Sequence, residues 1–203
     1  MKTINSFLTL LMFLLLTFTT KPIIASGVKD TDGSMLENGG DYFILPSFDE
    51  EGGGVTIASI GTLPLAIVQS ASKDSLGLPV SISNTEGTMI ILAHEMVNIK
   101  FPNFPDCNNF STCMLVMDES VNVWYLGIGN VADYPSHQIK MGKFQIKEYN
   151  SDYKLTFCGD ANTSSCEDVG IYIDGDRNRR LVLSEVGTVV KIKNAHKSHL
   201  ADD

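Results

Sequence analysis

The sequence contains no long segment with the apolar spacing of an amphipathic helix, so neither a helical bundle nor alternating helices and strands are indicated. Basic residues are few, because 15 Lys and Arg stand against 24 Asp and Glu, and this balance argues against nucleic acid or an anionic membrane as partner. The four histidines are scattered, and neither a GxSxG motif nor a Cys–His arrangement accompanies them. We therefore expect no enzyme active site and no cofactor.

An apolar run of membrane length is also missing after residue 26. The run Phe7–Phe18 follows Lys2 and precedes the small residues Ala25 and Ser26. This layout predicts a cleaved secretory leader over residues 1–26, with an uncleaved signal anchor as the alternative. The leader carries two lysines and no acids, so its removal takes the formal charge from −9 to −11. We expect a soluble, monomeric mature protein without membrane contact, either secreted to the extracellular space (apoplast) or vacuolar.

Cysteine is scarce, and its four positions, Cys107, Cys113, Cys158 and Cys166, allow three pairings. In a secreted protein an even number of cysteines indicates disulfides, and the clustering favours two local bridges, Cys107–Cys113 and Cys158–Cys166. A zinc site is not indicated, because neither pair has CxxC spacing and no histidine lies near.

Two further motifs depend on short strings of residues. Asn109 and Asn162 each begin a triplet that fits the N-glycosylation sequon, and both triplets lie in polar stretches between cysteines. The string DGDRNRRLVLSE at 174–185 spaces its acidic residues like a calcium-binding EF-hand loop. Arg179 stands where that loop needs a glycine, so we expect no metal.

Short runs rich in Val, Ile, Tyr, Phe and Thr recur along the chain, separated by Gly, Asn, Asp and Pro. They predict strands at 41–45, 54–59, 65–69, 79–83, 88–93, 97–101, 122–127, 143–149, 152–158, 170–174, 179–184 and 188–193. About a dozen short strands predict one closed or sandwiched all-β domain over residues 27–193. The last residues, 194–203, lack apolar periodicity and predict a mobile tail.

The string VKDTDGSMLENGGDYFILPS at 28–47 resembles the start of mature plant Kunitz-type inhibitors, the soybean trypsin inhibitor family. The matching residues are Val28, Asp30, Asp32, Gly33, Leu36, Asn38, Gly39, Gly40 and Tyr42. Further matches follow in family order at 64–70, 77–83, 97–101, 153–158 and 166–184. The resemblance implies a β-trefoil of about twelve strands with exposed loops, one of which enters a serine protease as a substrate would.

The register of the resemblance places that reactive-site loop in the string SNTEGTMI at 83–90. Gly87 stands at the primary position, which fills the main specificity pocket of the protease, and Asn38 stands where the family has a residue that bonds to loop carbonyls from behind. The implied loop consists of Asn84, Thr85, Glu86, Gly87, Thr88, Met89 and Ile90. Glycine admits many backbone states, so it is expected to weaken preorganisation of the loop.

Two departures from the family pattern bear on function. No Lys or Arg lies between Asp74 and Lys100, so the cation that trypsin reads against a buried Asp is missing. The family's second bridge matches Cys158 and Cys166, but its first bridge begins where this chain has Leu63. The resemblance therefore implies an inhibitor of an endopeptidase other than trypsin, serine-type or possibly cysteine-type. The alternative is a β-trefoil binding, storage or defence protein that has lost inhibition.

Overall fold

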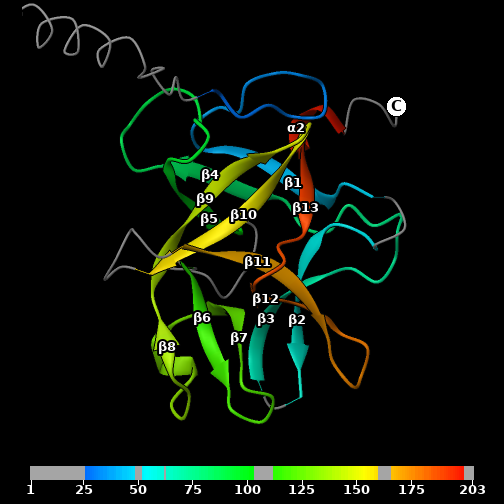
Figure 1. Cartoon of the computed structure of the whole chain (residues 1–203), viewed down its shortest axis with the longest axis vertical. Coiled ribbons are helices and arrows are strands. Elements are labelled where there is room, and N and C mark those ends of the chain that lie inside the picture. Colours follow the sequence, from blue (N-terminus) through cyan, green and yellow to red (C-terminus); the bar gives the residue numbers. More distant parts are fainter. Residues whose placement is uncertain (1–25, 49–51, 62, 103–111, 160–165, 199–203) are drawn as a thin grey trace, which may run out of the picture.

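Thirteen antiparallel β-strands dominate the computed structural model, which describes residues 26–48, 52–61, 63–102, 112–159 and 166–198 (Figure 1). Six of them form a closed ring, in which β13 pairs with β1 and the order runs through β4, β5, β9 and β10 back to β13. These barrel strands are β1 (Gly40–Pro46), β4 (Val80–Asn84), β5 (Met96–Lys100), β9 (Gly142–Tyr149), β10 (Asp152–Gly159) and β13 (Val189–Asn194).

Three hairpins close one end of this barrel. They are β2 (Val55–Ile60) with β3 (Leu63–Gln69), β6 (Thr112–Asp118) with β7 (Val123–Gly129), and β11 (Cys166–Ile173) with β12 (Arg179–Ser184). The strands β3, β7 and β12 pair with one another, so the hairpins form a three-fold cap. Each third of the chain thus adds two barrel strands and one hairpin, which is a β-trefoil, and the expected fold class is confirmed.

The small elements complete the described structure. Strand β8 (Ile139–Lys140) pairs with β6, a 3-10 helix covers Val131–Asp133, and the helix α2 (Ala195–Ser198) follows β13. Ala195 is buried, so the tail predicted from residue 194 is ordered at its start, while residues 199–203 lie outside the described part. Among the described residues, no helix is long and apolar enough to cross a membrane.

The core follows from the alternation of the strands. In β5, Val97 and Ile99 are buried while their neighbours are less so, as expected when one face of a strand lies against the interior. One apolar cluster fills the barrel and extends to Val28, Leu36 and Ile91 outside the strands. A second, smaller cluster lies between the cap hairpins.

Eleven of the twelve predicted strands occur, and two errors stand out. Residues 88–93 form no strand, because their backbone contacts are two isolated bridges, Glu37 with Ile90 and Gly27 with Leu92. Strand β6 was not predicted, although it pairs with β7 along its whole length. The first error concerns the candidate loop directly.

Candidate functional site

The predicted loop joins β4 to β5 and projects from the end of the barrel opposite the β6–β8 strands (Figure 1). Its first half is open to solvent, since Thr85, Glu86 and Gly87 are exposed. Its second half is bound along its backbone to the N-terminal segment, residues 26–38. Four hydrogen bonds join the two: Val28 N to Ile91 O (2.9 Å), Ile91 N to Leu36 O (2.9 Å), Asn38 N to Met89 O (2.9 Å) and Ala93 N to Ser26 O (2.8 Å).

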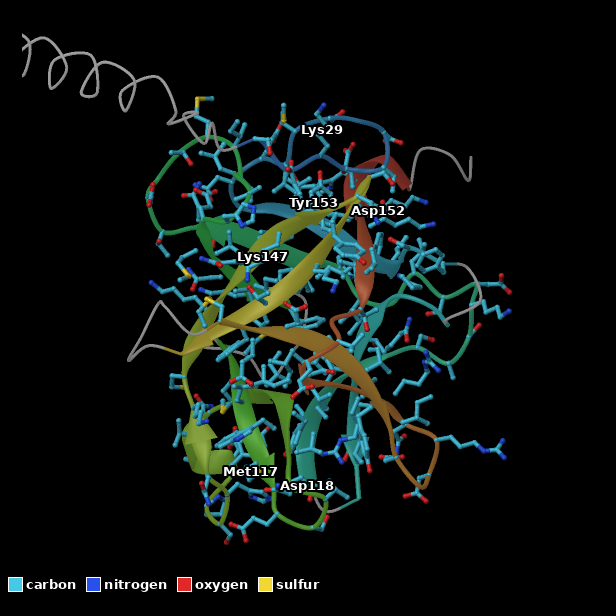
Figure 2. The ribbon with its side chains drawn as sticks, in the orientation of Figure 1. Lys29, Met117, Asp118, Lys147, Asp152 and Tyr153 are labelled. Atoms are coloured by element: carbon cyan, nitrogen blue, oxygen red, sulfur yellow. A yellow bond between two sulfur atoms is a disulfide. The ribbon has the colours of Figure 1, made fainter. Side chains whose placement is uncertain are left out.

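The N-terminal segment is itself attached to the barrel. The backbone N–H of Lys29 donates to the Tyr153 hydroxyl of β10 at 2.8 Å, and the N–H of Thr31 donates to the Ile192 carbonyl of β13 at 2.8 Å. Figure 2 shows Lys29 and Tyr153 at one end of the molecule and Asp118 at the other. The loop is therefore held to the barrel through the N-terminal segment.

Asn84 braces the loop from within. Its side chain is 8% exposed, and its Oδ1 accepts the Gly87 N–H at 2.8 Å. Its Nδ2 lies 3.1 Å from the Thr88 carbonyl and 3.2 Å from the Ile90 carbonyl, and it also contacts the Thr88 hydroxyl. The Thr88 hydroxyl donates to the Ile90 carbonyl at 2.9 Å. The buried Asn84 amide thus satisfies backbone groups of the loop that a paired strand would otherwise satisfy.

The side chain of Asn38 supports the loop indirectly, although its backbone N–H bonds directly to the Met89 carbonyl. The family resemblance implies that its side-chain amide bonds to loop carbonyls, but its Oδ1 accepts the Asn84 backbone N–H at 3.0 Å and its Nδ2 donates to Asn84 Oδ1 at 3.3 Å. Asn84 makes the bonds to the carbonyls instead. The sequence includes Asn84 among the presented loop residues, and the structure places it behind them. Asn before a small, polar turn is a signal for such self-bonding, because its side chain mimics the backbone.

Gly87 adopts a left-handed backbone conformation, with φ at +74°. A Cβ placed on it would meet no atom within 4 Å, so the reason for glycine here is the backbone and not packing. Among the described residues, nothing donates a hydrogen bond to the Gly87 carbonyl, whereas the carbonyls of Thr88, Met89 and Ile90 are all turned inward to partners. The carbonyls of Thr85 and Glu86 also lack a donor among the described residues, so Gly87 carries the last open carbonyl before the fixed half of the loop. It stands at the position that the register of the resemblance assigns to the primary residue.

This arrangement can present a short exposed stretch of backbone, which ends at Gly87, to another protein. A protease active site needs a substrate carbonyl that is free to enter its oxyanion hole, and the loop leaves the Gly87 carbonyl free while it fixes those that follow. The side chains that point outward carry no cation, because none lies between Asp74 and Lys100. Met89 is 88% exposed and gives the loop an apolar side chain.

A sequence profile of the legume Kunitz family, described as trypsin and protease inhibitor, matches residues 28–194. This chain belongs to that family. The family is one of protease inhibitors. Kunitz trypsin inhibitor 5 of Arabidopsis thaliana is 32% identical over 197 residues, which covers 94% of this chain and 96% of the relative. The subtilisin inhibitor CLSI-II of Canavalia lineata is 31% identical over 165 residues, or 77% of this chain and 85% of the relative.

A solved Kunitz structure agrees with the fold. Soybean trypsin inhibitor in its complex with porcine pancreatic trypsin has a TM-score of 0.72 to this chain at 30% identity. The superposition covers 84% of this chain and 99% of the soybean inhibitor.

One predicted disulfide of the Kunitz chain is present. Cys158 and Cys166 are bonded where β10 and β11 pair, with their Cα atoms 4.2 Å apart. Cys113 is buried in β6, but its predicted partner Cys107 lies outside the described residues. The two sequons, at Asn109 and Asn162, lie outside them as well.

The EF-hand-like string of the Kunitz chain forms a hairpin turn. Asp174 Oδ1 accepts the backbone N–H groups of Asp176 and Asn178 at 3.0 and 2.9 Å. Burial raises the pKa of Asp174, but hydrogen bonds from Asn178 and Asp176 outweigh it and lower that pKa. Within the described ranges, no group of three or more His, Cys, Asp or Glu is placed to hold a metal ion.

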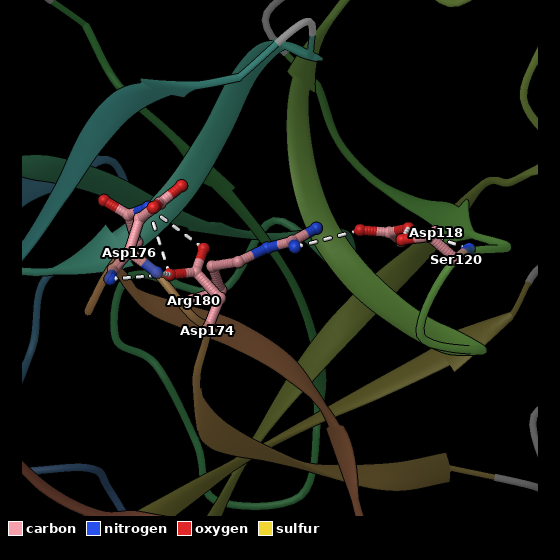
Figure 3. A network of polar contacts seen from close by, with 6 residues as sticks. Asp118, Ser120, Asp174, Asp176 and Arg180 are labelled. Atoms are coloured by element: carbon pink, nitrogen blue, oxygen red, sulfur yellow. Dashed lines mark hydrogen bonds and ion pairs between the residues drawn. The ribbon is translucent and has the colours of Figure 1, made fainter.

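An ion pair between a buried arginine and a half-buried aspartate follows this turn. Arg180 of β12 donates to Asp118 of β6 at 3.0 Å, and Ser120 also donates to Asp118 (Figure 3). The Arg180 side chain is 5% exposed and lies over the Tyr125 ring at 4.5 Å. Burial raises the pKa of Asp118, but the hydrogen bonds from Ser120 and Arg180 outweigh it and lower that pKa. The pair joins two hairpins of the cap at the end of the molecule away from the loop.

Proposed function

We propose that the mature chain inhibits an endopeptidase of the serine type, other than trypsin, through the loop Asn84–Ile90. The observation that supports this most is the arrangement of the loop carbonyls. Those of Thr88, Met89 and Ile90 bond to the scaffold, while that of Gly87 remains open. The exposed stretch Thr85–Gly87 is therefore the part of the loop backbone that is open to an active site, and the register of the family resemblance selects the bond after Gly87 within it.

The held loop favours tight binding. A loop that already has its bound shape loses little conformational entropy on docking, so an interface of ordinary size binds strongly. Gly87 does not yet have the bound shape, because a bound substrate strand is extended, whereas the backbone of Gly87 is left-handed with φ at +74°. Glycine changes between these conformations at little cost, so one residue adjusts while its neighbours stay fixed.

The target follows from the missing cation. Trypsin pairs a Lys or Arg with a buried Asp in its primary pocket, and Gly87 leaves that Asp unpaired. Loss of one partner of a buried charge pair costs about 2–5 kcal/mol, which is roughly 30-fold to several thousandfold in affinity. A protease with a small or uncharged primary pocket, of the elastase or subtilisin kind, has no buried Asp there and so does not lose this binding free energy. A cysteine protease reached through another surface is the alternative target.

The leader and the sequons support secretion. A run such as Phe7–Phe18 behind Lys2 directs export, and the sequons at Asn109 and Asn162 are modified only in the secretory pathway. We therefore propose that the protein is extracellular or vacuolar. Release of the glycan by an endoglycosidase, followed by mass spectrometry, tests whether either site is used.

The experiment is an inhibition panel of trypsin, elastase, subtilisin and papain, with protein secreted from the full-length chain. Beside wild type it uses Gly87→Arg and the matched control Gly87→Ala. Both variants have the same left-handed backbone strain, about 1–2 kcal/mol, so their difference on trypsin isolates the cation.

We expect wild type to inhibit elastase or subtilisin, and Gly87→Arg to inhibit trypsin at least about 30-fold better than Gly87→Ala. Equal trypsin inhibition by the two variants would show that Gly87 does not occupy the primary position. If wild type inhibits none of the four proteases, the inhibitor hypothesis fails for these classes and a binding or storage role takes its place.

A further inference from the structure

Met89 combines a fixed backbone with a free side chain. Its carbonyl accepts the Asn38 N–H at 2.9 Å, and Ile91, two residues later, is buried. Its side chain is nevertheless 88% exposed, more than any other large hydrophobic side chain in the described part of the chain. An apolar side chain held in water on a fixed backbone gains the full benefit of burial when a partner covers it.

The neighbours of Met89 turn the other way. The Thr88 hydroxyl bonds to the Ile90 carbonyl, and Ile90 is half-buried, with its Cδ1 3.6 Å from where a Cβ of Gly27 would lie. Beyond Gly87, Met89 is therefore the outward-facing side chain of the fixed half of the loop. It follows the open carbonyl by two residues, on the side of the leaving group if the bond after Gly87 is the one attacked.

We propose that Met89, and not Gly87, is the specificity-determining residue of the loop, and that it fills an apolar subsite of the target protease on the leaving-group side. This inference rests on the proposed inhibitory function. Gly87 gives the primary pocket no side chain, and among the exposed loop residues Thr85, Glu86 and Met89 only Met89 offers a large apolar side chain. The unbranched thioether of Met89 adapts to an apolar subsite of irregular shape.

The first test measures Ki for the protease that wild type inhibits best, using Met89→Ala and Met89→Leu. Loss of a buried methionine side chain is expected to raise Ki roughly 10- to 100-fold in Met89→Ala, and Met89→Leu should stay within about threefold because it keeps the apolar volume. Val186 is 77% exposed on the turn after β12, so Val186→Ala is the control for loss of any exposed apolar side chain and should leave Ki within about twofold.

The second test uses oxidation. Hydrogen peroxide transfers one oxygen atom to the methionine sulfur and leaves as water, and the resulting sulfoxide is polar. Treated wild type should lose inhibition by a similar factor to Met89→Ala, whereas treated Met89→Leu should keep it. Met35 is 44% exposed and oxidises in both proteins, so the comparison assigns the effect to Met89.

The outcomes separate the two hypotheses. If wild type inhibits a protease but Met89→Ala changes Ki by less than twofold, the inference is wrong and the proposed function stands. Equal loss of inhibition by treated wild type and treated Met89→Leu also overturns it. If wild type inhibits no protease, the proposed function fails and the role of Met89 fails with it.

Discussion

Replacement of Asn84 by alanine tests whether the loop is held in place by its internal amide. In Asn84→Ala, the Gly87 N–H and the Thr88 carbonyl lose the side-chain partner that the structure gives them. The Ile90 carbonyl keeps the Thr88 hydroxyl. The backbone N–H of residue 84 still donates to Asn38, so the base of the loop stays attached while its tip is released.

The size of the effect follows from these contacts. A hydrogen bond contributes about 0.5–1.5 kcal/mol net, and Asn84→Ala removes five: those with the Gly87 N–H, the Thr88 carbonyl and hydroxyl, the Ile90 carbonyl and Asn38 Nδ2. Water can replace part of these bonds at the exposed tip, so the total loss of loop stabilisation is about 2–3 kcal/mol. If that free energy is needed to hold the loop in its bound shape, Ki should rise roughly 30- to 150-fold.

The assay compares Asn84→Ala with Asn38→Ala for Ki, for thermal unfolding and for the rate at which the target protease cuts the loop. Asn38→Ala loses two hydrogen bonds to Asn84, but the Asn84 side chain keeps its own bonds to the loop carbonyls. We therefore expect a rise in Ki of only about 5- to 30-fold. Cleavage should accelerate most in Asn84→Ala. Asn84 does not brace the bound shape of the loop if Asn84→Ala unfolds at a lower temperature with Ki unchanged, or if Asn38→Ala is the weaker inhibitor.

Three further predictions concern the rest of the chain. Because the pKa of Asp118 is lowered, its ionised carboxylate stabilises the folded protein fully at neutral pH, and this contribution is lost as pH falls below about 4. Asp118→Asn should lower the free energy of unfolding by about 3 kcal/mol at pH 7, and urea unfolding of this variant should depend less on acid pH than that of wild type. Replacement of both Cys158 and Cys166 by serine should cost about 2.5 kcal/mol in the same assay. The sequence predicts a leader that ends at residue 26, but the Ser26 carbonyl accepts the Ala93 N–H, so we expect mass spectrometry of the secreted protein to find Ser26 retained at the N-terminus. A start at Gly27 would show that the boundary predicted from the sequence is right and that this hydrogen bond is absent from the mature protein.

Local pattern predicts the barrel strands well but fails where the partner is distant in sequence. Val97 and Ile99 alternate with less buried residues, and that period is visible in the sequence. Residues 88–93 look like a strand because the run TMIILA is rich in Thr and Ile. The segment that buries Ile91 and Ala93 lies more than 50 residues earlier, however, and pairs with the run through two isolated bridges only. Strand β6 was not predicted from the sequence, because its Met and Leu residues favour helices as much as strands.

The family resemblance located the candidate loop, and the structure changed the interpretation of its residues. From the sequence, Gly87 is expected to make the loop backbone more flexible. In the structure its left-handed φ is the conformation in which its N–H bonds to Asn84. Asn38 was predicted to bond to the carbonyls, and Asn84 does so. Two asparagines 46 positions apart give no pairwise signal in a single sequence, so only the coordinates reveal that they act together.

The division of the loop into bracing and outward residues makes the protein a natural grafting scaffold. Thr85, Glu86 and Met89 take no part through their side chains in the hydrogen bonds that shape the loop among the described residues, so a library randomised at these three positions keeps the brace intact. New recognition sequences can then be selected without redesign of the fold. The same division lets mutation retarget such a loop quickly, because changes in what it binds need not disturb how it is held.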